Sequence, residues 1–192
     1  MSQPVENQRK SELLNGVVAM APRPSFNHNV VSGNLYNTFF NYLRHNTCSV
    51  FGDGMEVFLT EKDKVVPDMT VVCNPSLFRK NGIHGAPNLI VEVLSPGTTK
   101  SDRGYKMGLY AQCGVGEYWI VEPIAQVLEI YLLENGHYTL ADTYTHYSED
   151  DIEDMTDQER QELVVEAFST PLFPDLKIPL ADVFAKTLRT YY

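Results

Sequence analysis

The sequence predicts a single α/β domain over residues 1–192, built on a mixed β-sheet that helices cover on both faces. The main observation is the order of the predicted elements. Between a hairpin near each end, this order is helix, strand, strand, strand, helix, strand. The second observation is size, because 192 residues with 43% hydrophobic side chains suffice for one sizeable core. Residues 1–10 are expected to be flexible.

The N-terminal half contains a turn signal followed by a helical pattern. Asn15-Gly16, between two apolar runs, predicts a tight hairpin turn. Apolar side chains recur at helical spacing after this hairpin, and either Ser25 or Asn27 could cap the helix. The elements predicted here are a hairpin over residues 12–22, a helix over 28–44, strands over 49–60 and 64–75, and a polar loop over 74–87.

The C-terminal half repeats these signals. Gly114 predicts the end of a helix, and Asn135-Gly136 predicts a second hairpin turn. The elements predicted here are a strand over residues 88–97, a helix over 101–113, a strand over 116–123, a hairpin over 127–144 and a short final helix over 180–188.

Glu92 is the first residue that indicates chemistry. It lies within the apolar run "LIVEV", and a buried Glu is rare unless it is paired, hydrogen-bonded or bound to a metal. An arginine in the core is one possible partner. Another possibility follows from Asp68, which opens the preceding strand. If the two strands are antiparallel neighbours, both carboxylates meet at one edge of the sheet. Two close carboxylates repel each other unless a cation lies between them, and Mg²⁺ suits such oxygen ligands.

Lys106 is the cation expected beside this pair. A metal ion there would polarise a phosphoryl oxygen and lower the pKa of a bound water, while an ammonium would orient that water or stabilise transition-state charge. Lys106 lies in the helix that follows Glu92, whereas Lys100, the alternative, lies in the preceding loop. The competing interpretation pairs Lys106 with Asp102, four residues earlier, on the helix surface. Tyr110, one turn further on, is expected to be a packing residue.

Three segments resemble the Uma-type family of bacterial restriction endonucleases, which belongs to the PD-(D/E)xK nuclease superfamily. They are "VVPDMTVV", "GAPNLIVEVLSPGT" and "SDRGYKMGLYAQCGVGEYWIVEP". The resemblance extends over roughly residues 11–188, including "ELLNG", "PSFNHN" and "PLFPDLKIPLADVF". It implies a restriction-endonuclease-like core in the order αβββαβ, with added hairpins at both ends.

The resemblance also implies a metal-dependent endonuclease that hydrolyses DNA phosphodiester bonds. Asp68 and Glu92 take the positions of the two catalytic acids. Leu94 stands where the superfamily has its lysine, and the resemblance implies that the lysine lies on the following helix instead, at Lys106. The implied cofactor is Mg²⁺, with Mn²⁺ as a substitute. Its implied ligands are Asp68, Glu92, the main-chain carbonyl of Val93 and, in place of the first-helix acid of other members, Glu12. His28 could contact phosphate or metal, or be a satisfied surface histidine.

Charge argues against strong nucleic-acid binding. The net charge is −10, and residues 148–162 carry eight acids and one base, which accounts for −7 of it. This acidic segment is expected to be a solvated loop or a short helix. The implied partners are nevertheless DNA and a second copy of the chain. The alternative is a catalytically inactive binding or regulatory protein that keeps the nuclease fold.

Composition also predicts the cellular environment. No apolar run approaches the length needed to span a membrane, and the N-terminus lacks the apolar stretch of a secretory signal. Cys48, Cys73 and Cys113 are far apart and odd in number, which indicates neither a zinc site nor a disulfide framework. These observations predict a cytoplasmic protein with reduced thiols.

Overall fold

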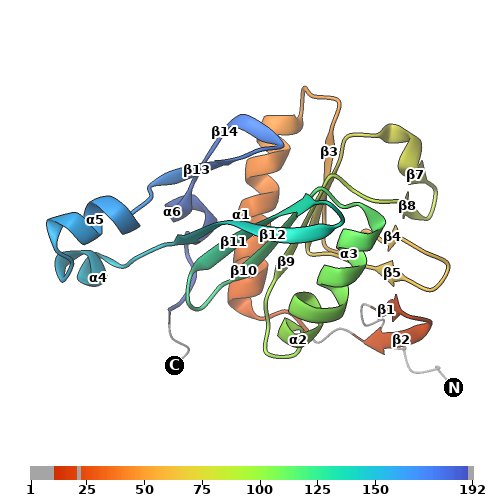
Figure 1. Ribbon diagram of the computed structural model, residues 1–192, viewed down its shortest axis with the longest axis horizontal. Coiled ribbons are helices and arrows are strands. Elements are labelled where there is room, and N and C mark those ends of the chain that lie inside the picture. Colours follow the sequence, from red (N-terminus) through yellow and green to blue (C-terminus); the bar gives the residue numbers. More distant parts are fainter. Residues whose placement is uncertain (1–10, 21–22, 190–192) are drawn as a thin grey trace, which may run out of the picture.

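The computed structural model describes residues 11–20 and 23–189, and the segment 1–10 that the sequence predicts to be flexible lies outside them (Figure 1). Its centre is a six-stranded sheet in the order β12-β11-β10-β9-β6-β3. Strands β9 and β10 are parallel and the other neighbours are antiparallel, which confirms the predicted mixed sheet. The strands are β3 (Ser49–Gly52), β6 (Met69–Val72), β9 (Leu89–Val93), β10 (Glu117–Glu122), β11 (Val127–Glu134) and β12 (His137–Thr145).

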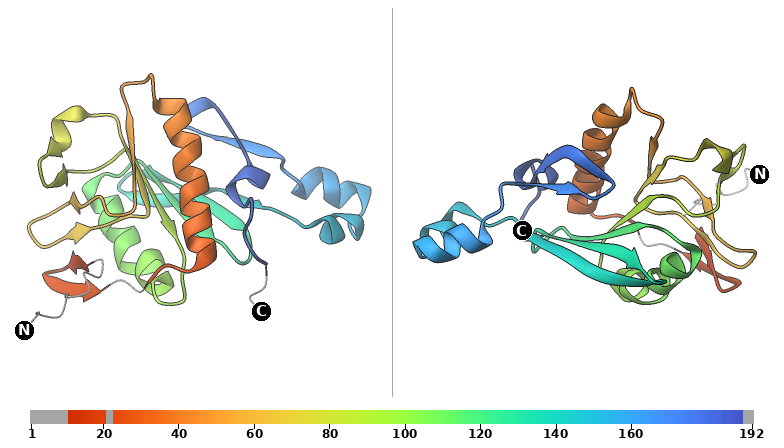
Figure 2. Two further views of the ribbon diagram at one scale, coloured as in Figure 1. Left: turned by 180° about the vertical axis from the view of Figure 1, so that it is seen from behind. Right: turned by 45° about the horizontal axis from the view of Figure 1, so that its top comes forward.

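Helices cover both faces of this sheet (Figure 2). Helix α1 (Phe26–Leu43) packs on one face, and the Ser25 side chain caps it by accepting from the His28 N–H. The other face is covered by a continuous helical segment that consists of α2 (Thr99–Ser101), a π-helical turn (Asp102–Lys106) and α3 (Met107–Cys113). This segment ends at Gly114, whose φ of 88° is left-handed, as the sequence predicts.

A second six-stranded sheet, in the order β2-β1-β5-β4-β8-β7, was not predicted. The expected strand over 64–75 contributes to it because that strand is divided at Pro67-Asp68, and its two parts join different sheets. Proline lacks the N–H that a central strand donates, which favours such a break. The expected loop over 74–87 also contains a 3-10 helix (Pro75–Leu77) and two short strands. The strands of this sheet are β1 (Ser11–Leu14), β2 (Val17–Met20), β4 (Val57–Phe58), β5 (Lys64–Val65), β7 (Phe78–Arg79) and β8 (Gly82–His84).

Both Asn-Gly hairpin turns are confirmed. Asn15 and Gly16 connect β1 to β2, and Asn135 and Gly136 connect β11 to β12. All four residues have positive φ, between 50° and 81°. This is the type I′ geometry that matches the twist of paired strands and that Asn and Gly tolerate best.

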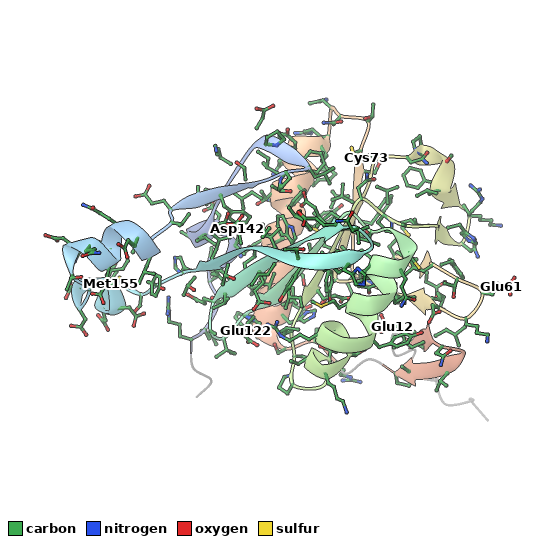
Figure 3. All side chains as sticks on the ribbon, in the orientation of Figure 1. Glu12, Glu61, Cys73, Glu122, Asp142 and Met155 are labelled. Carbon is green, nitrogen blue, oxygen red and sulfur yellow. A yellow bond between two sulfur atoms is a disulfide. The ribbon has the colours of Figure 1, made fainter. Side chains whose placement is uncertain are left out.

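The C-terminal part adds a hairpin and a projection. The hairpin pairs β13 (Ala167–Thr170) with β14 (Phe173–Pro179), and α6 (Leu180–Val183) follows it. The acidic segment forms two short exposed helices, α4 (Glu149–Glu153) and α5 (Asp157–Leu163), each begun by a capping box. They project from the body of the molecule, where Met155 marks the connection between them (Figure 3).

The prediction of reduced thiols is wrong for two of the three cysteines. Cys48 and Cys73 form a disulfide, and Cys113 is free. Strands β3 and β6 pair antiparallel with Ser49 opposite Val72, so the next position along this ladder places Cys48 opposite Cys73. Their separation of 25 residues conceals this pairing, because only the sheet register brings the two side chains together.

Alternation along the strands decides which side chains lie beneath α3. On β9, Leu89, Val91 and Val93 belong to the core under α1, whereas Ile90, like Leu94 just after the strand, belongs to the core under α3. Because side chains alternate between faces, Glu92 points to the α3 face together with Ile90. In the described part of the chain, no helix combines the length and apolar character that crossing a membrane requires.

Candidate functional site

Asp68 and Glu92 lie at the same edge of the sheet, as predicted: Asp68 immediately precedes β6, Glu92 lies on β9, and both line the pocket described below. In the antiparallel β6–β9 pair, Met69 faces Val91 and Thr70 faces Ile90. One step further in the same register, Asp68 faces Glu92, and residues directly opposite in a sheet point to the same face. Both acids are buried, Asp68 with 5% of its surface exposed and Glu92 with 2%.

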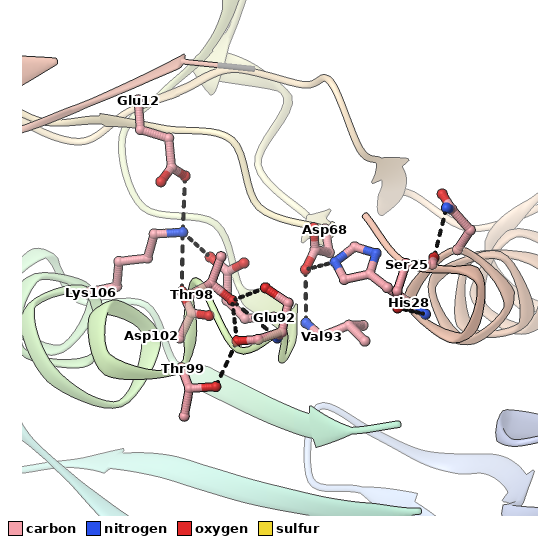
Figure 4. Close-up of polar contacts among 12 residues, drawn as sticks. Glu12, Ser25, His28, Asp68, Glu92, Val93, Thr98, Thr99, Asp102 and Lys106 are labelled. Carbon is pink, nitrogen blue, oxygen red and sulfur yellow. Dashed lines mark hydrogen bonds and ion pairs between the residues drawn. The ribbon is translucent and has the colours of Figure 1, made fainter. Parts of the chain in front are cut away.

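Asp68 is oriented from two directions. Its Oδ2 accepts a hydrogen bond of 2.8 Å from the Val93 N–H, and the His28 Nε2 lies 3.0 Å from the same oxygen (Figure 4). His28 sits in the first turn of α1 and is buried, so the interpretation of a surface histidine is wrong. The N-terminal end of α1 therefore meets the edge of the sheet where Asp68 lies.

Lys106 is enclosed by three carboxylates. Its Nζ lies 3.0 Å from Glu12 Oε1, 3.2 Å from Glu92 Oε1 and 3.3 Å from Asp102 Oδ1. The side chain is 4% exposed, and Figure 4 shows it reaching from its helix into the space between these acids. Lys100, the alternative candidate, is exposed and does not line the pocket described below.

Glu12 reaches this cluster from the N-terminal hairpin. It lies on β1, which pairs with β5 through Leu13 and Lys64. Its Oε1 accepts a 2.9 Å hydrogen bond from the Val66 N–H in addition to contacting Lys106. The second sheet, which sequence patterns missed, is therefore what carries Glu12 to the site.

Asp102 is a site residue that sequence reasoning assigned to the helix surface. It is 1% exposed and belongs to the π-helical turn that ends at Lys106. The competing interpretation is correct in pairing Asp102 with Lys106, at 3.3 Å, but its surface location is wrong, because both residues are buried. The spacing of Asp102 and Lys106 could have indicated that Asp102 is buried. Residues four apart share one side of a helix, so a buried Lys106 brings Asp102 inward with it.

The carboxylates keep Lys106 charged. Burial by itself would lower the pKa of the Lys106 ammonium, but the negative charges of Glu92, Glu12 and Asp102 outweigh burial and hold it above its usual value. Burial raises the pKa of Asp102, and the charge of Lys106 opposes that rise. Burial, followed by the charge of Glu92, also raises the pKa of Tyr110 well above its ordinary range.

A pocket opens over these groups. The described residues that line it include five acids and two permanent cations, Arg23 and Lys106. Arg23 and Asp53, both exposed at the rim, are lining residues that sequence reasoning did not single out. The five acids are Glu12, Asp53, Asp68, Glu92 and Asp102.

The donor chemistry of this pocket suits a divalent ion that retains water. Among residues 11–20 and 23–189, no cluster of three or more His, Cys, Asp or Glu side chains is arranged to hold a metal. Mg²⁺ does not need such a cluster, because it commonly binds one or two carboxylates, several waters and a substrate phosphate. Asp68 and Glu92 on one sheet face fit that mode of binding.

Comparisons with known proteins identify the family and the fold of this chain. A family model described as "Uma2: Putative restriction endonuclease" matches residues 2–171. The uncharacterized protein slr1290 of Synechocystis is 31% identical over 129 residues, which cover 66% of this chain and 68% of that protein.

A crystal structure described as "a putative nuclease belonging to DUF820", from Anabaena variabilis, has the same fold. It superposes with a TM-score of 0.70 over 94% of this chain and 92% of its own, at 16% identity. Together with the αβββαβ core, this match confirms the restriction-endonuclease-like fold predicted from the sequence. Because the family model matches most of its length, the chain belongs to the Uma2 family of putative restriction endonucleases.

Proposed function

We propose that this protein is a metal-dependent endonuclease that hydrolyses DNA phosphodiester bonds with Mg²⁺, or with Mn²⁺ in its place. The observation that carries the proposal is the placement of Asp68 opposite Glu92, with the Lys106 ammonium 3.2 Å from Glu92. The descriptions of the family and of the Anabaena structure, which name a restriction endonuclease and a nuclease, support the same activity.

Three groups are the proposed metal ligands, the carboxylates of Asp68 and Glu92 and the main-chain carbonyl of Val93. Glu12, which the resemblance offers as a further ligand, is engaged by the Lys106 ammonium and the Val66 N–H. When bound, the ion supplies Lewis acidity toward a phosphoryl oxygen and a lowered pKa for its water. His28 and the Val93 N–H fix Oδ2 of Asp68, which keeps that carboxylate in one orientation.

Lys106 acts as a cation in the proposed reaction. The negative charges of Glu92, Glu12 and Asp102 hold the pKa of Lys106 above its usual value, so the side chain serves as a positively charged ammonium. It can donate a hydrogen bond to a phosphate oxygen and offset the negative charge of the transition state. In the hydrolysis, the water oxygen forms a bond to phosphorus while the bond from phosphorus to the leaving sugar oxygen breaks. The attacking water gives up one proton to solvent, and the leaving sugar oxygen takes one proton from solvent.

Charge makes the metal necessary for substrate entry. With five acids and two permanent cations among its described lining residues, the pocket repels a phosphodiester on its own. A divalent ion held by Asp68 and Glu92 offsets two of these negative charges. The proposed assembly is a homodimer that cuts one DNA strand per subunit.

Nicking of a supercoiled plasmid tests the proposal. Wild type is incubated with Mg²⁺, with Mn²⁺ and with either ion plus EDTA, and is compared with Asp68→Ala and Glu92→Ala. We expect nicking that requires the ion and is lost in both variants, while circular dichroism shows that they remain folded. Asp175→Asn, a change at an exposed acid on β14, is the control that should cut like wild type.

Two results would reject the proposal. Equal residual nicking in wild type and both variants would indicate a contaminating nuclease. Absence of cleavage with either ion, on linear, supercoiled and single-stranded DNA, would favour the inactive binding or regulatory protein.

A further inference from the structure

We propose that Asp102 is a positioning residue that holds the Lys106 ammonium at Glu92 and keeps it there when a cation occupies the site. The catalytic consequence rests on the proposed function, whereas the positioning itself does not. Asp102 does not reach the reacting atoms in this proposal and acts only through Lys106.

The first support is the placement of the Asp102 carboxylate. It is 1% exposed, and its Oδ1 forms an ion pair of 3.3 Å with Lys106 Nζ. Burying a carboxylate is costly unless a charge and hydrogen bonds compensate it. Lys106 is the cation that Asp102 contacts, so the two side chains determine each other's position.

The second support is the backbone that carries both residues. Asp102–Lys106 is a π-helical turn between two α-helical segments, and such turns are rare and concentrate at functional sites. The Tyr118 hydroxyl, from β10, donates a 3.0 Å hydrogen bond to the Asp102 carbonyl oxygen. This contact anchors the turn to the central sheet and directs Asp102 and Lys106 to the same buried space.

The third support is that two positive groups share the Glu92 carboxylate. In the proposed function Glu92 contacts Lys106 and also binds a divalent cation, and these two positive groups repel each other. With Glu92 as its only partner, Lys106 would be displaced by the cation. Asp102 and Glu12 contact the ammonium from outside the Asp68–Glu92 pair, so they retain it beside the site.

Amine labelling tests the positioning without metal or DNA. Full-length wild type, Asp102→Asn and Asp102→Glu are treated with an amine-acylating reagent at one fixed pH, and modification of each lysine is followed by peptide mass spectrometry. We expect Lys106 to be protected in wild type and to react at least about tenfold faster in Asp102→Asn, with Asp102→Glu in between. Lys100, which is exposed, is the internal reference for reagent strength.

A loss of global stability is distinguished by a second internal reference. Lys64 lies in the second sheet and pairs with Glu56, far along the chain from the π-helical turn. Global unfolding would raise labelling of Lys64 and Lys106 together, whereas loss of positioning raises Lys106 alone. If Asp102→Asn does not fold, Asp102→Glu carries the comparison, because the added methylene displaces the carboxylate from Nζ.

Plasmid cleavage supplies the catalytic readout. We expect Asp102→Asn to lower kcat by about ten- to a hundredfold with little change in KM, and Asp102→Glu to recover part of the loss. Unchanged labelling of Lys106 in every folded variant, or labelling that rises equally at Lys64, overturns the proposal. If wild type cuts no DNA, the proposed function fails, but the labelling result still decides whether Asp102 positions Lys106.

Discussion

The Tyr110 hydroxyl donates a hydrogen bond of 2.7 Å to Oε1 of Glu92, the same oxygen that lies 3.2 Å from the Lys106 ammonium. Tyr110 and Lys106 are one helical turn apart, so the helix presents two donors to one buried carboxylate oxygen. Tyr110 is therefore a packing residue, as predicted, and also a hydrogen-bond donor to the site.

Tyr110→Phe removes one of these donors and preserves the ring. We expect the free energy of unfolding to fall by about 2 kcal/mol, because the lost hydrogen bond has a charged acceptor. Urea denaturation at neutral pH measures this change in the free energy of unfolding. Tyr105→Phe is not a suitable control, because its hydroxyl bonds to Asp63. Tyr36→Phe on α1 is a better one. A loss equal to that of Tyr36→Phe would contradict the assigned contact.

Lys106→Met leaves Glu12, Glu92 and Asp102 without their shared cation. We expect a loss of about 3–5 kcal/mol at neutral pH, because a buried charge loses its partner. Burial raises the pKa of Asp102 and Lys106 opposes this rise, so without Lys106 the pKa rises further. The folded variant then binds protons more tightly than the unfolded chain, and its stability increases as pH falls.

The pH dependence is the decisive measurement for Lys106→Met. Its stability deficit relative to wild type should be largest near pH 7 and shrink as the pH approaches the ordinary range of a carboxyl group, about 4. Urea denaturation at several pH values follows this difference. A deficit that stays constant with pH would show that the loss comes from packing alone.

Asp63→Asn is expected to loosen the N-terminal hairpin. Asp63 accepts hydrogen bonds from the Asn15 N–H, the Thr60 hydroxyl and the Tyr105 hydroxyl, of 2.7, 2.6 and 2.6 Å. Burial acts to raise the pKa of Asp63, but these hydrogen bonds outweigh it and lower the pKa. A lowered folded pKa gives stability that is present above the unfolded pKa and is lost as the pH falls through the folded value.

We therefore expect Asp63→Asn to cost about 1–3 kcal/mol at pH 7, with a difference from wild type that narrows below about pH 4. Hydrogen exchange at the amides of β1 should also accelerate, since Asn15 and Tyr105 are joined through Asp63. Asp175→Asn again serves as the matched surface change. If β1 exchanges as slowly as in wild type, Asp63 does not hold the hairpin.

His28→Ala tests whether the ring supports Asp68. A side chain that orients a metal ligand typically contributes ten- to a hundredfold in affinity, so we expect Mn²⁺ binding to weaken by about this factor. Calorimetric titration without DNA measures binding separately from cleavage. His45→Ala, at an exposed histidine beyond α1, should bind Mn²⁺ like wild type. Equal affinity in all three proteins would remove His28 from the site.

The Cys48–Cys73 disulfide is expected to stabilise the fold by about 3 kcal/mol, because it closes a loop with a sequence separation of 25 residues. Cys48→Ser should lower the denaturation midpoint, and a reductant should bring wild type down to the same midpoint. Cys113→Ser is the matched control, since its thiol is free. A midpoint that reductant leaves unchanged would mean that the bond does not form in solution.

Local sequence patterns determined most of the elements. The Asn15-Gly16 and Asn135-Gly136 turns, the helical pattern of α1 and the Gly114 helix end depend on neighbours within about one turn of chain, and each is confirmed; of the two candidate caps, the structure selects Ser25. The sequence also nominated Asp68, Glu92 and Lys106. Two strands joined by a loop are commonly antiparallel, which was enough to place the two acids at one edge.

Only the tertiary structure decided what surrounds these three residues. The second sheet delivers Glu12, the π-helical turn buries Asp102, the start of α1 brings His28 to Asp68, and the β3–β6 register joins Cys48 to Cys73. Each of these arrangements depends on packing against strands that are distant in the sequence. Local propensity carries no information about such contacts, because their free energy arises only once the whole core has assembled.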